Sequence, residues 1–311
     1  MESPLRNTTH RAVLKEARRR LNLYDTATID AEILLGHVLG TTRSYLHTWP
    51  ERKLDTVQLA QFNALIERRL CGEPVAYITG RREFWSLELN VTRDTLIPRP
   101  ETELLVELAL QHIPAHAAWN IADLGTGSGA IALALARERP HCKIVATDIS
   151  PVALEIARAN AARLNIRNVE FRLGSSDWFA SLQNESFDMI VSNPPYIKSD
   201  DACLQDLRFE PEIALVAGAD GLQHLRVIAE RSREYLTPSL ALPRQGGEDN
   251  LPSSSGEYGD AGGWLLLEHG YDQGPDMLHM LTQLGYVNVQ DYADLAALPR
   301  IVAAQWVSPH G

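Results

Sequence analysis

Four consecutive residues, Asn193, Pro194, Pro195 and Tyr196, can hold a planar NH₂ group while its nitrogen is alkylated. The lone pair of an amide nitrogen is delocalised, so acceptors against its two N–H groups must stabilise the positive charge that develops during attack. The Asn193 side-chain oxygen can accept one N–H and the Pro194 carbonyl the other, while the Tyr196 ring lies on the flat group. Each proline restricts φ to about −65°, which stiffens the turn and removes a competing donor. The four residues therefore predict a substrate-binding and catalytic site for an amide or amino nitrogen.

The segment 123–129, Asp-Leu-Gly-Thr-Gly-Ser-Gly, follows an apolar strand and directly precedes a helix. Its glycines permit a sharp turn and close approach of a ligand, and the helix start offers free N–H groups. A dinucleotide site would have a third glycine where Ala130 stands, and Asp123 would place negative charge beside a diphosphate. Asp123 instead suits a ligand with an ammonium group, such as the amino acid part of S-adenosylmethionine. The predicted cofactor-binding residues of this loop are Gly125, Thr126, Gly127, Ser128 and Gly129.

Two further positions extend the predicted cofactor site. Asp148, at the end of the second predicted strand, can accept hydrogen bonds from both ribose hydroxyls, although it could also simply precede the helix that starts at Pro151. After the third strand, Asp177 could accept from an adenine amino group while the Trp178 ring packs on the base. A loop aspartate beside a core tryptophan would explain the same pair, and both interpretations stay open.

The order of the predicted elements indicates an α/β fold with a Rossmann-like, doubly wound parallel sheet and an additional helical domain. Residues 1–75 show helical spacing of apolar residues, with Asp30 as the expected start of the second helix, and predict a helical bundle. Residues 76–97 alternate and predict a hairpin linker. Residues 98–311 form the predicted catalytic domain, in which strands alternate with helices as in a parallel sheet. Its strands are expected at 119–124, 143–147, 169–173, 187–192 and 263–268, its helices at 101–111, 130–139, 151–165 and 222–235, and a final antiparallel hairpin at 286–292 and 300–306. Thr237–Gly262, rich in Pro, Gly and Ser, is expected to be a flexible insertion.

Composition limits the class of protein. The 311 residues carry a net charge of −11, which argues against a large nucleic-acid footprint. No long apolar segment and no signal-peptide core is present, so we expect no membrane partner and a cytoplasmic location. Cys71, Cys142 and Cys203 are too far apart for a disulfide framework or a metal cluster, and no metal is expected.

Taken together, these segments resemble the peptide chain release factor glutamine methyltransferases, the PrmC/HemK family. The match covers nearly the whole chain. It is carried by IPRPETE at 97–103, DLGTGSGAIALALA at 123–136, ATDISPVAL at 146–154, SDWF at 176–179, VSNPPYI at 191–197, RFEPEIAL at 208–215, DGL at 220–222 and GGWLLLEHG at 262–270. The chain departs from the family in the length of the 237–262 segment and in the turn at 293–300.

The resemblance implies methylation of N5 of the glutamine in the Gly-Gly-Gln motif of class 1 release factors, with S-adenosylmethionine as donor and S-adenosylhomocysteine as product. It implies donor contacts from Gly125–Gly129, Asp148, Trp178 and Asn193, and glutamine contacts from Asn193–Tyr196. It also implies that the helical domain docks the release factor. The individual roles of Arg99, Glu101, Glu210 and Glu268 stay unassigned.

Other functions would use some of the same residues. An amino-methyltransferase acting on adenine or cytosine explains Asn193–Tyr196 equally well, and glutamine of a ribosomal protein is another possible acceptor. A binding module with the same fold would be revealed by failure to bind S-adenosylmethionine. A dehydrogenase is disfavoured by the glycine spacing.

Overall fold

The computed structural model describes residues 8–237 and 262–307, which fall into two compact units. The first unit reaches to Arg81 and includes Val91–Arg93 and Gln205–Phe209. The second contains Arg82–Asn90, Asp94–Leu204 and the chain from Glu210 onward. Within the described ranges, no helix combines the length and the apolar character needed to cross a membrane.

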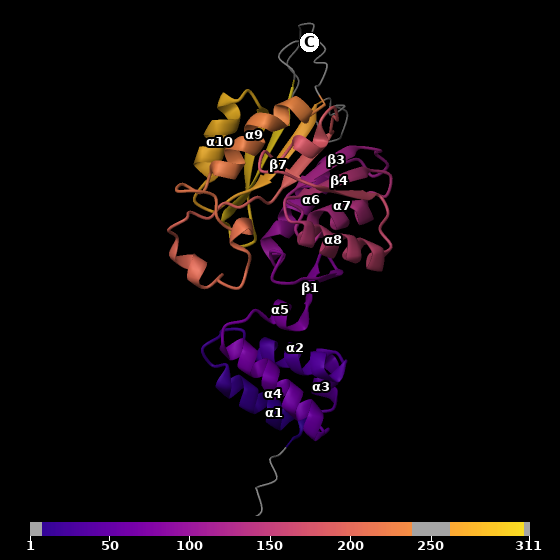
Figure 1. Cartoon of the computed structure of the whole chain (residues 1–311), viewed down its shortest axis with the longest axis vertical. Coiled ribbons are helices and arrows are strands. Elements are labelled where there is room, and N and C mark those ends of the chain that lie inside the picture. Colours follow the sequence, from indigo (N-terminus) through magenta and orange to yellow (C-terminus); the bar gives the residue numbers. More distant parts are fainter. Residues whose placement is uncertain (1–7, 238–261, 308–311) are drawn as a thin grey trace, which may run out of the picture. The chain divides into compact units, whose positions relative to one another are not determined.

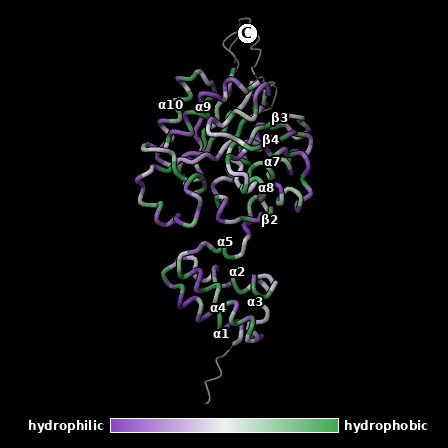
Figure 2. Tube along the Cα trace, in the orientation of Figure 1, coloured by the Kyte–Doolittle hydropathy of each residue, from purple (hydrophilic) through white to green (hydrophobic). Residues whose placement is uncertain are grey.

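The first unit is a bundle of short helices, as the spacing of its apolar residues predicts. The helices are α1 (His10–Arg20), α2 (Ala27–Leu39), α3 (Arg43–Thr48), α4 (Thr56–Leu70) and α5 (Val75–Thr79). Colours alternate between hydrophobic and hydrophilic along α1, α2 and α4 in Figure 2. The hydrophobic sides meet in one core that contains Ala17, Leu34, Phe62 and Ile66. A capping box between Asp55 and Gln58 starts α4.

The expected start of α2 at Asp30 is wrong. The helix begins at Ala27, and Asp30 lies buried in its first turn. Its carboxylate accepts a hydrogen bond from the Thr26 hydroxyl at 3.0 Å and one from Arg69 Nε at 2.8 Å. The Arg69 guanidinium also lies 3.8 Å from the centre of the Tyr24 ring. Asp30 therefore links α2 to α4 through an ion pair rather than capping a helix.

The predicted hairpin exists but is shorter than 76–97. Residues 76–79 belong to α5, which ends at Gly80 with φ 72°. The strands are β1 (Arg81–Phe84) and β2 (Leu87–Asn90), joined by Trp85 and Ser86. These two turn residues have φ of 50° and 55°, as a type I′ hairpin turn requires.

The second unit contains a seven-stranded sheet in the order β5-β4-β3-β6-β7-β9-β8. The pairs from β5 to β7 are parallel, whereas β9 is antiparallel to both β7 and β8. This confirms the predicted α/β fold and its terminal antiparallel hairpin. The strands are β3 (Asn120–Leu124), β4 (Lys143–Asp148), β5 (Val169–Leu173), β6 (Met189–Ser192), β7 (Gly263–Glu268), β8 (Val287–Ala293) and β9 (Pro299–Trp306).

Helices cover both faces of this sheet (Figure 1). Alternate strand residues point to opposite faces, so Ile121 packs with α6 and α7 while Ala122 packs with α9 and α10. The helices are α6 (Glu103–His112), α7 (Ala130–Glu138), α8 (Pro151–Leu164), α9 (Gln223–Tyr235) and α10 (Gly274–Gln283), with 3₁₀ turns η1 (Pro100–Thr102), η2 (Ala180–Leu182), η3 (Ala202–Gln205) and η4 (Glu212–Ala214). The prediction left out α10, although Pro275 in its first turn and the buried Met277 and Leu281, four residues apart, are typical helix signals.

Strand order creates a switch point between β3 and β6. From β3 the chain moves outward through β4 and β5, then returns to place β6 on the other side of β3. In open α/β sheets a ligand crevice lies at the strand carboxyl ends at such a point. The predicted insertion at 237–262 lies outside the described residues except for its two ends.

Candidate functional site

A cavity of about 350 Å³ lies at this switch point. Its lining includes Gly125 after β3, Asp148 at the end of β4, Trp178 after β5, and Asn193 and Pro195 after β6. Leu124 pairs with Ser192 across the two central strands, so the glycine loop and the Asn193 turn leave the sheet side by side. The structure therefore brings the glycine loop and the Asn193 turn, the two segments that the sequence predicted to form the site, to one cavity.

The glycine loop is bent back on β4 by its own backbone. The amides of Gly125 and Thr126 both donate to the Thr147 carbonyl at 2.9 Å. Gly125 has φ 74°, and a Cβ there would stand 3.1 Å from the Trp178 ring. Glycine is thus required at position 125, because it adopts this positive φ without strain and has no Cβ that would fill the cavity beside Trp178.

Asp123 lies behind this loop and is fully buried. Its Oδ2 accepts the Thr126 hydroxyl at 2.6 Å and the Ala132 amide at 3.2 Å. Its Oδ1 has no hydrogen-bond partner among the described residues. Burial, opposed by these hydrogen bonds, raises the pKa of Asp123 to about 7. An unpaired buried carboxyl oxygen beside the loop is the kind of group that a ligand ammonium would stabilise.

Asp148 is held by the two loops around it. Its Oδ2 accepts the Gly127 amide at 2.8 Å and its Oδ1 accepts the Ser150 amide at 2.9 Å. Burial raises its pKa, and the two hydrogen bonds oppose that shift. Each carboxylate oxygen can accept more than one hydrogen bond, so Asp148 can still receive two hydroxyl groups from a ligand in the cavity.

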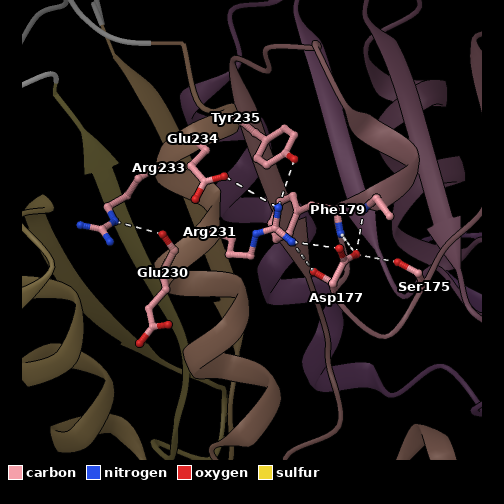
Figure 3. Close-up of polar contacts among 9 residues, drawn as sticks. Ser175, Asp177, Phe179, Glu230, Arg231, Arg233, Glu234 and Tyr235 are labelled. Carbon is pink, nitrogen blue, oxygen red and sulfur yellow. Dashed lines mark hydrogen bonds and ion pairs between the residues drawn. The ribbon is translucent and has the colours of Figure 1, made fainter.

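Trp178 and Asp177 separate in the structure. The Trp178 ring lines the cavity and meets the His224 ring edge-on, with centroids 5.4 Å apart. Asp177 points to Arg231 Nη1 at 3.1 Å and accepts the Ser175 hydroxyl and the Phe179 and Ala180 amides (Figure 3). These bonds, with that of Ser175 the largest cause, lower the pKa of Asp177 to about 2. Asp177 is therefore engaged with Arg231, Ser175 and the backbone of its own turn, and it is not among the residues that line the cavity.

In the turn after β6, the Asn193 side chain has a defined neighbour. Its Nδ2 donates to Thr102 Oγ1 at 3.1 Å, which leaves Oδ1 as the acceptor that a ligand can use. The turn is tied to β3 because the Ser192 hydroxyl donates to the Leu124 carbonyl at 2.7 Å. Asn193 can therefore present an oxygen to the cavity from a rigid support.

Tyr196 is anchored at both ends. Its hydroxyl donates to Glu268 Oε1 at 3.2 Å, and its carbonyl accepts from Gln273 Nε2 at 3.1 Å. Burial raises the pKa of the Tyr196 phenol, so it is neutral at physiological pH.

Five predicted site residues, although all described, do not line the cavity: Thr126, Ser128, Gly129, Pro194 and Tyr196.

Thr102 and Glu268 are the polar neighbours of this turn that sequence reasoning did not assign. Glu268 ends β7, the strand next to β6, and is fully buried. Burial raises its pKa to about 7, while hydrogen bonds from Thr102 and Tyr196 act in the opposite direction. A polar residue at the carboxyl end of the strand adjoining β6 was a usable signal, but only once the strand order was known.

Glu210 and Arg99 shape one edge of the cavity. The Glu210 carboxylate accepts the Ile97 amide at 3.1 Å and pairs with the Arg99 guanidinium. Residues on either side of this link, Leu96 and Pro211, line the cavity. Glu210 and Arg99 thus hold two distant parts of the chain together at the rim.

Comparisons with known proteins match most of the chain. Residues 12–80 match the family described as the PrmC N-terminal domain, and residues 102–212 match the methyltransferase small domain. A release factor glutamine methyltransferase from Aliivibrio fischeri is 46% identical, over 95% of this chain and 97% of its own length. One from Escherichia coli is 45% identical, over 90% and 94%. Among solved structures, a methyltransferase from Pyrococcus furiosus has a TM-score of 0.51 at 17% identity, covers 78% of this chain and 98% of its own, and shows the fold alone.

Proposed function

The chain belongs to the release factor glutamine methyltransferase family, and we propose that it methylates N5 of the glutamine in the Gly-Gly-Gln motif of class 1 peptide chain release factors. S-adenosylmethionine is the methyl donor and S-adenosylhomocysteine the product. One observation carries the proposal. The glycine loop, Asp148 and Asn193 line a single cavity, and the engagement of Asn193 Nδ2 by Thr102 leaves Oδ1 to accept an amide N–H.

The residues of the cavity fit the donor. Gly125 leaves space where a Cβ would meet Trp178, and Asp148 retains acceptor capacity for ribose hydroxyls. Behind the glycine loop, the unpaired Oδ1 of the buried Asp123 can stabilise the ammonium group of the donor. Trp178 offers a ring face to the base. Thr126, Ser128 and Gly129 belong to the loop but do not line the cavity; the Thr126 hydroxyl donates to Asp123, and the Ser128 carbonyl accepts from Asn160. When bound, the donor supplies an electrophilic methyl group on a positively charged sulfur.

The turn residues position the glutamine. Asn193 Oδ1 accepts one amide N–H. The carbonyl of Pro194, which lies in the chain between the cavity-lining Asn193 and Pro195, accepts the other, so that the nitrogen lone pair is directed toward the donor. Acceptors at both hydrogens also stabilise the positive charge that grows on nitrogen as the new N–C bond forms. Pro195 lines the cavity and keeps the turn rigid, and the ring of the next residue, Tyr196, packs on the flat amide when the glutamine is bound. No base is required before transfer, because the nitrogen can lose its proton to water afterward.

The helical unit is the part that we assign to docking the release factor. Its match to the PrmC N-terminal domain supports this. The cytoplasm is the compartment that we infer, since all three cysteines are free thiols.

Mass spectrometry of a purified release factor after incubation with the protein and donor tests the proposal. We expect one added methyl on the glutamine of the Gly-Gly-Gln peptide with the wild-type chain and none in reactions without donor. Parallel reactions with ribosomal protein, DNA and RNA, in which transfer of tritium from labelled donor is measured, test the other acceptors. Label on nucleic acid or ribosomal protein with none on the release factor would refute the proposal.

A further inference from the structure

A chain of polar contacts leads from the cavity to a buried carboxyl group. Asn193 Nδ2 donates to Thr102 Oγ1, and the Tyr196 hydroxyl donates to Glu268 Oε1. The Thr102 hydroxyl lies near enough to Glu268 to favour the charged form of its carboxyl and so lower its pKa. Thr102 is 3% exposed and Glu268 is 1% exposed, so water does not compete for these bonds. Both groups that the proposed function uses for glutamine therefore connect to one carboxyl.

We propose that Thr102 and Glu268 are positioning residues that set the orientation of the Asn193 side-chain amide. The inference rests on the proposed function, in which Asn193 must present its oxygen to the substrate. An asparagine amide can turn by half a rotation and exchange its oxygen for its NH₂ group with little change of shape. In the turned state, NH₂ would face the NH₂ group of the glutamine and repel it.

Hydrogen-bond polarity explains how the orientation is selected. A threonine hydroxyl has one hydrogen to donate, and a carboxylate can only accept. When ionised Glu268 receives that hydrogen, the Thr102 oxygen is left with lone pairs toward Asn193. Thr102 Oγ1 then accepts a hydrogen bond from the NH₂ group of the Asn193 amide and repels the amide oxygen. Glu268 thus acts on Asn193 through Thr102, without touching the substrate.

The surroundings of Glu268 indicate a functional rather than a stabilising role. Arg300 on β9 and the hydroxyls of Thr102 and Tyr196 favour its charged form, whereas Glu101 in η1 opposes it. Its second oxygen, Oε2, is buried without a partner among the described residues. Burial without full hydrogen bonding costs stability, which a neutral residue of the same shape would avoid.

A pair of substitutions at Thr102 separates this role from simple packing. Thr102→Val keeps the shape and removes the hydroxyl, whereas Thr102→Ser keeps the hydroxyl and removes the methyl group. We expect kcat to fall about 10- to 100-fold in the valine variant, with the donor Kd unchanged, and to stay within about threefold of wild type in the serine variant. The opposite pattern, with valine active and serine impaired, would overturn the proposal.

The pH profile provides a second readout. Protonated Glu268 could donate to Thr102 and release the constraint, so kcat should fall as the pH drops below neutral. Glu268→Gln should lower kcat and remove that acid limb. Asp188→Asn, which changes a carboxylate that accepts the Asn120 amide at the opposite end of β6, should leave both unaltered. An acid limb that persists unchanged in Glu268→Gln would contradict the proposal.

One measurement needs no substrate, so a failure of the proposed function can be told apart from a failure of this inference. In protein labelled with ¹⁵N-asparagine, the Asn193 side-chain NH₂ signals are assigned by their loss in Asn193→Ala. We expect slow hydrogen exchange for this NH₂ group in wild type and in Thr102→Ser, and at least about tenfold faster exchange in Thr102→Val. Equal exchange in the valine variant and wild type would refute the positioning role, whatever the enzyme methylates.

Discussion

Asn193 is neither an acid nor a base, so its contribution depends on where its oxygen is held. The Thr102 contact and the anchor between Ser192 and Leu124 hold the amide and its turn at the cavity. An acceptor that is already in place needs no reorganisation while charge develops on the substrate nitrogen. Removal of this acceptor should therefore slow the chemical step more than it weakens donor binding.

Asn193→Ala should raise the barrier to methyl transfer by about 3 kcal/mol, by analogy with the loss of one oxyanion-hole donor. That is roughly a 100-fold fall in kcat, with a much smaller change in donor affinity. Single-turnover kinetics and calorimetry with S-adenosylmethionine measure the two effects. Asn120→Ala, at the exposed start of β3, is the control. Turnover by Asn193→Ala close to that of the control would exclude the assigned role.

Glu268→Gln should make the protein more stable at alkaline pH while it impairs activity. The pKa of Glu268 is raised from 4.5 to about 7, so the folded state holds the proton more tightly than the unfolded chain. Its contribution to stability is therefore present below pH 4.5 and is lost as the pH rises through about 7. Relative to wild type, the variant should gain up to about 3 kcal/mol at pH 8 and little at pH 4. Denaturant titrations at both pH values test this, and a variant less stable at pH 8 would count against it.

Among the elements, α8 connects the β1–β2 hairpin to the glycine loop through one side chain. Asn160 is fully buried, accepts the Asn90 amide at 2.8 Å and donates to the Asn90 and Ser128 carbonyls at 3.0 and 2.9 Å. The loop is thus held on the sheet side by Thr147 and on the helix side by Asn160. Both supports are needed for a loop whose glycines have little intrinsic rigidity.

Asn160→Ala should destabilise the protein by about 3 kcal/mol, because it leaves the amide and carbonyl of Asn90 and the carbonyl of Ser128 without their hydrogen-bond partner. Thermal unfolding should show the Tm fall by roughly 10 °C, and donor affinity should fall as the loop loosens. Glu155→Ala, on the exposed face of the same helix, should change neither property. Wild-type stability and donor affinity in Asn160→Ala would show that this link is dispensable.

In the whole molecule, the site and the two described ends of the connection from α9 to β7, Thr237 and Gly262, lie at opposite ends of the sheet. Thr237 donates its amide to Phe187, just before β6, and Gly262 directly precedes β7. The six-residue strand β7 then runs to Glu268, a distance of about 20 Å at the usual rise per residue. Changes between Thr237 and Gly262 should therefore not reach the chemistry.

Replacement of residues 238–261 by a short Gly-Ser linker should leave kcat and the donor Kd within about twofold of wild type, because the junctions are distant from the cavity. Steady-state assays on release factor and calorimetry compare the two proteins. A fall in kcat of tenfold or more, with unchanged thermal stability, would contradict this separation of the connection from the site.

The amino-acid sequence by itself determined the class of fold, the order of most elements and the two segments that meet at the cavity. These features depend on local signals: apolar periodicity, the glycine loop between strand and helix, and the Asn-Pro-Pro-Tyr turn. The sequence did not separate the two interpretations of Asp177, because its partner Arg231 is 54 residues away. It also misplaced the start of α2, since the ion pair of Asp30 with Arg69 joins two different helices.

Only the tertiary structure assigned Thr102 and Glu268 to the site. Thr102 and Asn193 are 91 residues apart, and Tyr196 and Glu268 are 72 apart, so no local pattern connects them. The contact between Tyr196 and Glu268 follows from the order of strands in the sheet, which places the ends of β6 and β7 next to each other. Chain-distant hydrogen bonds of this kind depend on which strands pair, and pairing is a property of the whole sheet rather than of any one segment.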